Sequence, residues 1–285
     1  MGVKRIDLHL PMSWDQCTTN ELEHIADAII TEQASTGRFR PFNWERVKLN
    51  IVLAINGLTP DPSPVGDGSG DQEFMVHRGD EEPWPISTGQ LCSLCEKINW
   101  LTEKTASRII FRFPYPEILI RHTSGTIQLQ GPPPLLDGYT WKEYRWLTDW
   151  MQEYMRRAND RTRNEFLSIL FKPAASDIDH HSSAIFEGFS PIKWQVILFW
   201  WSSLMEQLAK KFPRVFKQQP VGKGKRLHRP DAPWDFYNRV TATVQKYVGG
   251  LSAQDVDEQP YGVTLQQLEM MADEAAEMEK IKRKK

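Results

Sequence analysis

Two cysteines have the spacing of a metal site. Cys92-x-x-Cys95 supplies half of the four ligands of a structural zinc site. The third cysteine, Cys17, stands alone, and no histidine pair follows at the usual distance. The pair also lies in a predicted helix, where Cys95 joins the apolar face, and a thioredoxin-like redox site would need a βαβ context that is missing. The pattern favours core packing over metal binding.

Two histidines follow two aspartates in "SDIDHHSS", where a metal or acid–base site would use His180, His181 and Asp177. Adjacent helical residues do not face the same way, so the two imidazoles cannot easily serve one centre. A polar helix start is the favoured interpretation. These three residues are the only candidates that an enzyme hypothesis has.

Two further stretches carry weak motifs. The basic segment 221–230 lacks the spacing of a phosphate-binding P-loop and the strand that should precede it, so we interpret it as a solvated loop that could contact phosphates or an acidic partner. "RGD" at 78–80 is expected by chance in a polar segment. We therefore predict no catalytic residue, no metal ligand and no cofactor.

The composition is that of an ordinary globular protein, with 285 residues, 40% of them hydrophobic and 25% charged. A net charge of −2 gives no general attraction to nucleic acid, so we expect no nucleic-acid partner. The apolar run 196–201 is far shorter than the roughly 20 residues that span a bilayer. Three cysteines without an export signal favour a reducing compartment, and we expect a cytoplasmic protein with no membrane partner.

Residues 1–131 are expected to form an α+β part. Helices are predicted after Thr18, Asn43 and Ser87, where Thr18 with Glu21 and Ser87 with Gln90 form capping boxes. The Pro-, Gly- and Asp-rich stretch 58–86 is predicted to be a mobile loop. Alternating residues at 108–113 and 117–130 predict a small antiparallel sheet with a turn at Ser124-Gly125.

Residues 132–250 are predicted to be helical, and residues 251–285 to form a linker followed by an amphipathic helix. The ranges of the predicted helices are 140–157, 161–171, 177–187, 191–212, 233–248 and 264–283. Thr140 with Glu143 should cap the first helix, and Thr264 with Gln267 the last. The fold class that follows is mainly α, a helical bundle with a small antiparallel β-hairpin or sheet in the first half.

The helix at 140–157 is unusually rich in aromatic residues. Its apolar arc covers well over half of its circumference, and Trp146 and Trp150 lie at one flank. Polar residues fill the remaining wedge: Lys142, Arg145, Asp149, Gln152, Glu153 and Arg156. Such a helix must be covered from at least two sides, by its own chain alone or also by another subunit.

The terminal helix has an apolar stripe that includes Leu265, Leu268, Met271 and Met278. A detached amphipathic helix rich in Met and Ala can dock in a partner's groove, and folding back on its own domain is the equal alternative. We therefore propose six residues as partner-binding candidates: Trp146, Trp150, Leu265, Leu268, Met271 and Met278.

Three stretches together resemble a family encoded in the tail gene modules of long-tailed phages and prophages. They are "LPMSWDQCTTNELEHIADAII", "PLLDGYTWKEYRWLTDWMQEYM…FLSILFKP" and "WWSSLMEQLAKKFPRVF". The resemblance implies a non-enzymatic, chaperone-like tail-assembly factor in a bacterial host cell. It also implies that the partner is another tail protein, either the tape-measure or the tail-tube protein. A homo-oligomer is a separate expectation, because another subunit could cover one flank of the aromatic helix.

Two alternatives stay open beside this hypothesis. The first is a structural virion component, such as a head–tail adaptor or minor tail protein, which would remain in purified particles. The second is an enzyme of unknown class.

Overall fold

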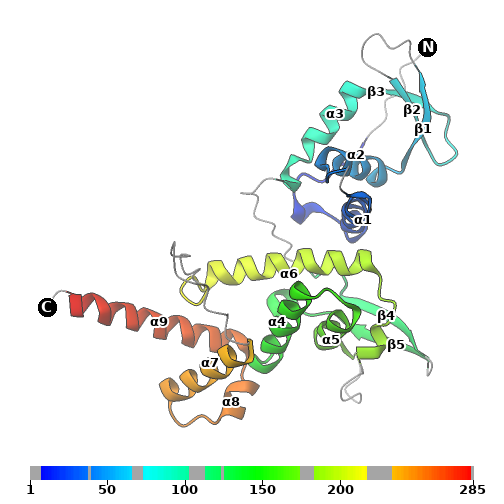
Figure 1. Cartoon of the computed structure of the whole chain (residues 1–285). Helices are drawn as coiled ribbons and strands as arrows, with labels where there is room; N and C mark the ends of the chain where they lie inside the picture. Colours follow the sequence, from blue (N-terminus) through cyan, green and yellow to red (C-terminus); the bar gives the residue numbers. More distant parts are fainter. Residues whose placement is uncertain are drawn as a thin grey trace. The chain divides into compact units, whose positions relative to one another are not determined.

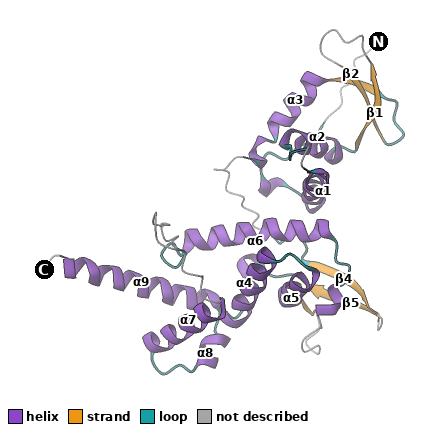
Figure 2. Ribbon diagram, viewed as in Figure 1, coloured by secondary structure: helices purple, strands orange, loops and turns teal. Residues whose placement is uncertain are grey.

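The computed structural model describes residues 8–37, 40–65, 73–102, 113–122, 125–173, 183–216 and 233–283. These residues are mainly α-helical and also form two three-stranded antiparallel sheets (Figures 1 and 2). The chain divides into two compact units. The first comprises Met1–Ile110 and Ser190–Ser203, and the second Phe111–Phe189 and Leu204–Lys285. None of the described helices has a stretch long and apolar enough to cross a membrane.

The helices of the first unit begin at the predicted caps. Both capping boxes form, at Thr18 and at Ser87, and the Asn43 side chain accepts hydrogen bonds from the first turn of the second helix. Buried apolar residues such as Ile25, Ile51 and Ile98 form the core. The elements are η1 (Trp14–Gln16), α1 (Thr19–Ser35), α2 (Trp44–Ile55), α3 (Thr88–Lys97) and η2 (Asn99–Leu101).

The stretch 58–86, predicted to be a loop, contains strands, so that prediction is wrong for its described residues. Strands β1 (Leu58–Val65), β2 (Glu73–Arg78) and β3 (Trp84–Ser87) pair in the order β1-β2-β3. The prolines of β1 lie on an edge strand, where the missing N–H groups are tolerated, and its register shifts between Pro60 and Pro64. Val76 at the centre of β2 is buried.

The second unit contains the predicted hairpin, which is confirmed. Strands β4 (Glu117–His122) and β5 (Gly125–Gln130) pair from end to end, and a short third strand, β6 (Lys172–Pro173), joins β5 from the second half of the chain. The sheet is therefore not confined to the first half. The predicted strand at 108–113 lies outside the described residues, except for Phe113.

A close approach of backbone and ring fixes the end of this hairpin. Gly131 donates a 2.7 Å hydrogen bond from its N–H to the carbonyl of Pro116. A Cβ at Gly131 would lie 2.3 Å from the Tyr115 carbonyl oxygen and 2.5 Å from the Phe113 ring. Only glycine fits here without a shift of the backbone.

The helices of the second unit start with η3 (Pro134–Leu136), α4 (Trp141–Arg156), α5 (Asp160–Leu170) and η4 (Ser183–Phe186). The capping box at Thr140 is confirmed. Of the predicted helix 177–187, the described part is a 3-10 turn, and the remainder lies outside the described residues. Large rings fill the core, including Trp141, Phe166 and Phe186.

The chain ends with α6 (Pro191–Lys211), α7 (Pro233–Val248), α8 (Ala253–Glu258) and α9 (Tyr261–Arg283). The predicted linker is wrong, because residues 253–258 form α8, which begins with a capping box between Ser252 and Asp255. The predicted cap at Thr264 is also wrong. Helix α9 begins three residues earlier, and Thr264 is fully buried within it, accepting a 2.8 Å hydrogen bond from the Gln259 amide.

The compact units also differ from the predicted parts. The division falls between Ile110 and Phe111 instead of at residue 131, and α6 contributes residues to both units. Because the continuous helix α6 contributes to both units, a domain boundary placed at a linker of distinctive composition cannot reproduce this division.

Candidate interaction site along helix α9

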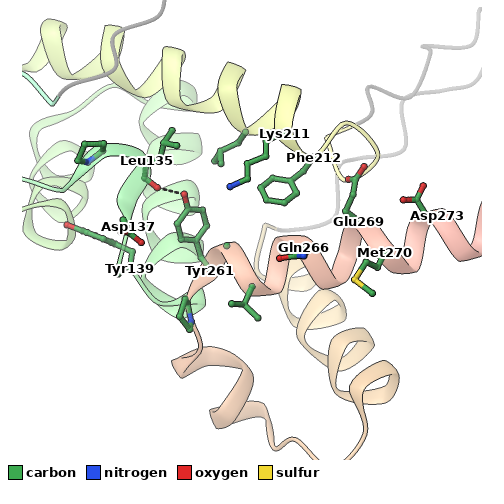
Figure 3. A pocket seen from close by; sticks show the side chains of 16 residues that line it. Leu135, Asp137, Tyr139, Lys211, Phe212, Tyr261, Gln266, Glu269, Met270 and Asp273 are labelled. Carbon is green, nitrogen blue, oxygen red and sulfur yellow. Dashed lines mark hydrogen bonds between the residues drawn. The ribbon is translucent and has the colours of Figure 1, made fainter.

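A groove of about 740 Å³ lies in the second unit, bordered by α9, the end of α6 and the segment that precedes α4 (Figure 3). Lys211 and Phe212 reach from the end of α6 toward α9, and Leu135 lies near Tyr261 at the other side. The lining combines apolar groups with ionisable ones. The main lining side chains are Leu135, Asp137, Tyr139, Leu208, Lys211, Phe212, Tyr261, Val263, Gln266, Glu269, Met270 and Asp273.

The start of α9 is held against the start of α4 by backbone pairing. The Trp141 N–H donates to the Gln259 carbonyl at 2.9 Å, and the Tyr261 N–H donates to the Tyr139 carbonyl at 3.0 Å. The rings add a stack, with the centroids of Tyr144 and Tyr261 4.8 Å apart. Much of the aromatic arc of α4 is thus covered by its own chain.

Tyr261 also lines the groove. Its hydroxyl donates to the carbonyl of Leu135, a residue with a left-handed backbone (φ 55°). Burial, with a smaller effect of the Asp137 charge, raises the pKa of Tyr261 to about 12. The phenol therefore stays protonated at neutral pH and serves as a donor to the backbone.

The acids of the far wall are also engaged within the unit. The Glu269 carboxylate accepts from the N–H groups of Arg214 and Val215, each at 3.0 Å, and so ties α9 to the turn that follows α6. Asp273 forms an ion pair with the Arg214 guanidinium. Three of the ionisable groups that line the groove, Tyr261, Glu269 and Asp273, thus hold its walls together.

Exposed apolar side chains gather at this groove and continue along α9. In the described part of the chain eleven large apolar side chains are exposed, and three of them, Leu135, Val263 and Met270, line the groove. Met278 and Ile281 lie further along the same helix and are 58% and 54% exposed.

We call Val263, Met270, Met278 and Ile281 the α9 strip. At 3.6 residues per turn these four residues fall within an arc of about 80°, and the rise of about 1.5 Å per residue gives the strip a length of about 27 Å. Figure 1 shows α9 running on past α7 and α8 within the second unit. The strip is therefore a narrow apolar line beside an open groove.

The structure separates the predicted partner-binding residues. Leu265 is buried at 1% exposure, so its assignment to a partner surface is wrong; it belongs to the core of its own unit. Leu268 and Met271 are half-buried, and Met278 is the one of the four predicted residues on α9 that is exposed. The predicted stripe is the face that packs inward along the first half of α9, and the α9 strip lies beside it.

The two tryptophans predicted to bind a partner are half-buried on α4. The Trp146 ring carries the Lys142 ammonium group 4.7 Å from its centroid. Neither Trp146 nor Trp150 lines the groove. Their role in binding a partner stays a prediction.

Two residues of the polar wedge of α4, Arg145 and Asp149, are buried. The Arg145 guanidinium donates to Asp257 on α8 at 3.0 Å and to Thr241 on α7 at 3.2 Å. Both carboxylate oxygens of Asp149 are buried without a hydrogen-bond partner. Burial raises the pKa of Asp149 to about 6, against a smaller lowering effect of the Arg145 charge.

The cysteine pair and the RGD motif do not line the groove. Cys95 is buried and burial raises the pKa of its thiol, whereas Cys92 is exposed. No cluster of three metal-ligating side chains occurs among the described residues. Arg78 of the RGD motif ends β2, where its Nε donates to the Asn56 carbonyl at 3.0 Å. Asp177, His180, His181 and the basic segment 221–230 lie outside the described residues.

Sequence reasoning missed Val263 and Met270. Their separation of seven residues, and that of eleven between Met270 and Ile281, places them on one side of a helix. The fold and the site thus define a mainly α protein with a groove bordered by helices and an adjoining exposed apolar strip. No protein-family model, curated protein or solved structure matches the chain.

Proposed function

We propose that this protein is a non-enzymatic assembly factor that binds another protein through the groove and the α9 strip. The observation that carries the proposal is the concentration of exposed apolar side chains there: five of the eleven in the described residues lie in the groove or on the outer part of α9. Scattered apolar residues are normal on a surface, whereas clustered ones mark interaction sites.

The form of the site supports binding of a helical segment. A groove between two helices accepts an amphipathic helix that inserts its apolar side chains. Two of the four strip residues are methionines, whose flexible side chains adapt to a partner surface. Tyr261, Glu269 and Asp273 make contacts within the unit and so shape the groove. Because these ionisable groups are engaged in this way, they support a role of the groove in binding rather than in catalysis.

The resemblance to phage tail-module proteins supplies the class of partner. We propose that the protein acts in tail assembly and binds another tail protein, with the tape-measure and tail-tube proteins as the first to test. An assembly factor of this kind acts while the tail is built. A virion component would instead be recovered from purified particles.

The proposal is tested by capture from infected or induced host cells. The full chain, tagged at its N-terminus, is compared with the variant Met270→Ser/Ile281→Ser. The matched control is Leu119→Ser/Met155→Ser, which removes two side chains of the same unit that are 70% and 74% exposed and lie outside the groove and strip.

We expect the unaltered chain and the control to recover a tail protein that mass spectrometry identifies, and the α9 variant to recover at least about tenfold less, since two apolar contacts contribute about 1.5 kcal/mol or more together. Equal recovery by all three would refute the role of the strip. If the unaltered chain recovers no tail protein, the proposed function is wrong.

A further inference from the structure

The α9 strip lies among acidic side chains. Residues 263–279 include five acids and no lysine, arginine or histidine. At 3.6 residues per turn, Glu274 falls inside the arc of the strip, and Asp273 and Glu277 fall on one flank of it. A surface of this kind is apolar along its centre and negative along its edge.

Neighbouring groups neutralise this charge only in part. Lys211 lines the groove with Glu269 and Asp273, and Arg214 pairs with Asp273. Glu274 accepts a 2.8 Å hydrogen bond from the Tyr247 hydroxyl, which carries no charge. Glu277 is exposed, and among the described residues it forms no ion pair. The basic residues of α9 begin only at Lys280, at the end of the strip.

From this arrangement we infer that the partner segment is a basic amphipathic helix, with lysine or arginine on the flank of an apolar stripe. The inference rests on the proposed function, since it specifies the partner of the same site. Its charge would complement the acids beside the strip, and electrostatic complementarity selects among partners and speeds encounter. A strip about 27 Å long matches a helix of about 18 residues.

The basic end of α9 limits where such a helix can lie. Lys280 and Lys282 would repel basic side chains, so those of the partner should lie beside the strip between the groove and Met278, with only apolar side chains over Ile281. A second copy of this chain is the main competing occupant. Two antiparallel α9 helices would place the basic end of each beside the acids of the other.

The test uses two labelled synthetic peptides of 18 residues, about the length of the strip. Both have leucine at the same helical positions to form one apolar stripe. One has lysine at the remaining positions and the other has glutamate. Fluorescence anisotropy measures binding of each to the full chain at low salt and at high salt.

We expect the lysine peptide to bind at least about tenfold more tightly than the glutamate peptide at low salt, because several exposed charge pairs act together. Salt should reduce the difference. The variant Glu274→Lys/Glu277→Lys should abolish or reverse the preference. The control Glu117→Lys/Glu187→Lys, the same change at two exposed acids of this unit, should retain it.

The outcomes separate this inference from the proposed function. Equal affinity for the two peptides, both lost in Met270→Ser/Ile281→Ser, would overturn the basic partner and leave the docking site. Affinity that Met270→Ser/Ile281→Ser leaves unchanged would overturn both. If light scattering shows a dimer that Glu274→Lys/Glu277→Lys dissociates, the occupant is a second copy and the inference is wrong.

Discussion

The buried carboxylate of Asp149 provides a prediction about stability. Asp149 is 5% exposed, neither of its oxygens has a hydrogen-bond partner, and burial raises its pKa from 3.8 to about 6. A difference of about two pKa units corresponds to about 3 kcal/mol. The free energy of unfolding falls by this amount when the group is ionised in both the folded and the unfolded state. Asp149→Asn removes the charge and keeps the shape.

The direction of the pH dependence follows from the sign of the shift. Below about pH 4 the carboxyl is protonated in both the folded and unfolded states, and it adds no penalty. Between about pH 4 and pH 6 the unfolded state ionises first, so the free energy of unfolding falls. Above pH 6 the penalty is fully present. We therefore expect Asp149→Asn to be more stable than the unaltered protein by about 1–3 kcal/mol at pH 8, and equal to it near pH 4.

Urea unfolding from pH 4 to pH 8 measures this difference, and hydrogen exchange of the α4 amides assigns it to the second unit. Glu187→Gln is the control, because Glu187 is an exposed acid of the same unit. A parallel pH dependence of Asp149→Asn and the unaltered protein would refute the reasoning. So would a variant that is less stable at pH 8.

Three further substitutions test the packing and the groove. Gly131→Ala should lower the free energy of unfolding by about 1–3 kcal/mol in urea titrations, whereas Gly37→Ala, where a Cβ meets nothing within 4 Å, should change it little. Glu32→Gln should be less stable than the unaltered chain at neutral pH but not at low pH. The pKa of Glu32 is lowered, chiefly by a hydrogen bond from the Arg46 guanidinium group, and the stability that this interaction gives is lost as pH falls below about 4.5. A difference in the free energy of unfolding that stays constant across a pH series would contradict this. Tyr261→Phe should cost about 1 kcal/mol by removing the donor to the Leu135 carbonyl, and faster hydrogen exchange after Leu135 would report the loosened groove wall.

Local features of the fold could be predicted from the sequence. The capping boxes at Thr18, Ser87 and Thr140 depend on residues three apart, and each forms as predicted. Helical periodicity located α4 to α7 because their apolar residues recur at the spacing of one helix face. These features depend on neighbours within one or two turns, which the sequence contains directly.

Features that depend on distant residues could not be predicted. The charges of Arg145 and Asp149 do not indicate burial, but both residues are buried, and Arg145 finds its partners on α7 and α8, about a hundred residues away. The β1 strand was hidden because its prolines are tolerated only on an edge, and an edge exists only once the sheet has formed.

Of the partner-binding residues predicted on α9, Leu265 packs inward and Met278 is exposed on the α9 strip. Leu265 and Met278 share one stripe in the sequence, yet α4 and α7 cover the first part of that stripe and leave Met278 exposed. Val263 and Met270 were overlooked because they lie outside the apolar stripe that was assigned to this helix. Which apolar residues of a long helix remain exposed depends on where its neighbours end.

Site-specific photo-crosslinking tests the central claim most directly. A photoreactive amino acid is placed at Met278 on the α9 strip and, in a second variant, at Met155, which is 74% exposed on α4 of the same unit. In cells that assemble the particle, we predict a crosslink from position 278 to another tail protein and none from position 155. Equal crosslinking from both positions, or none from position 278, would contradict the account.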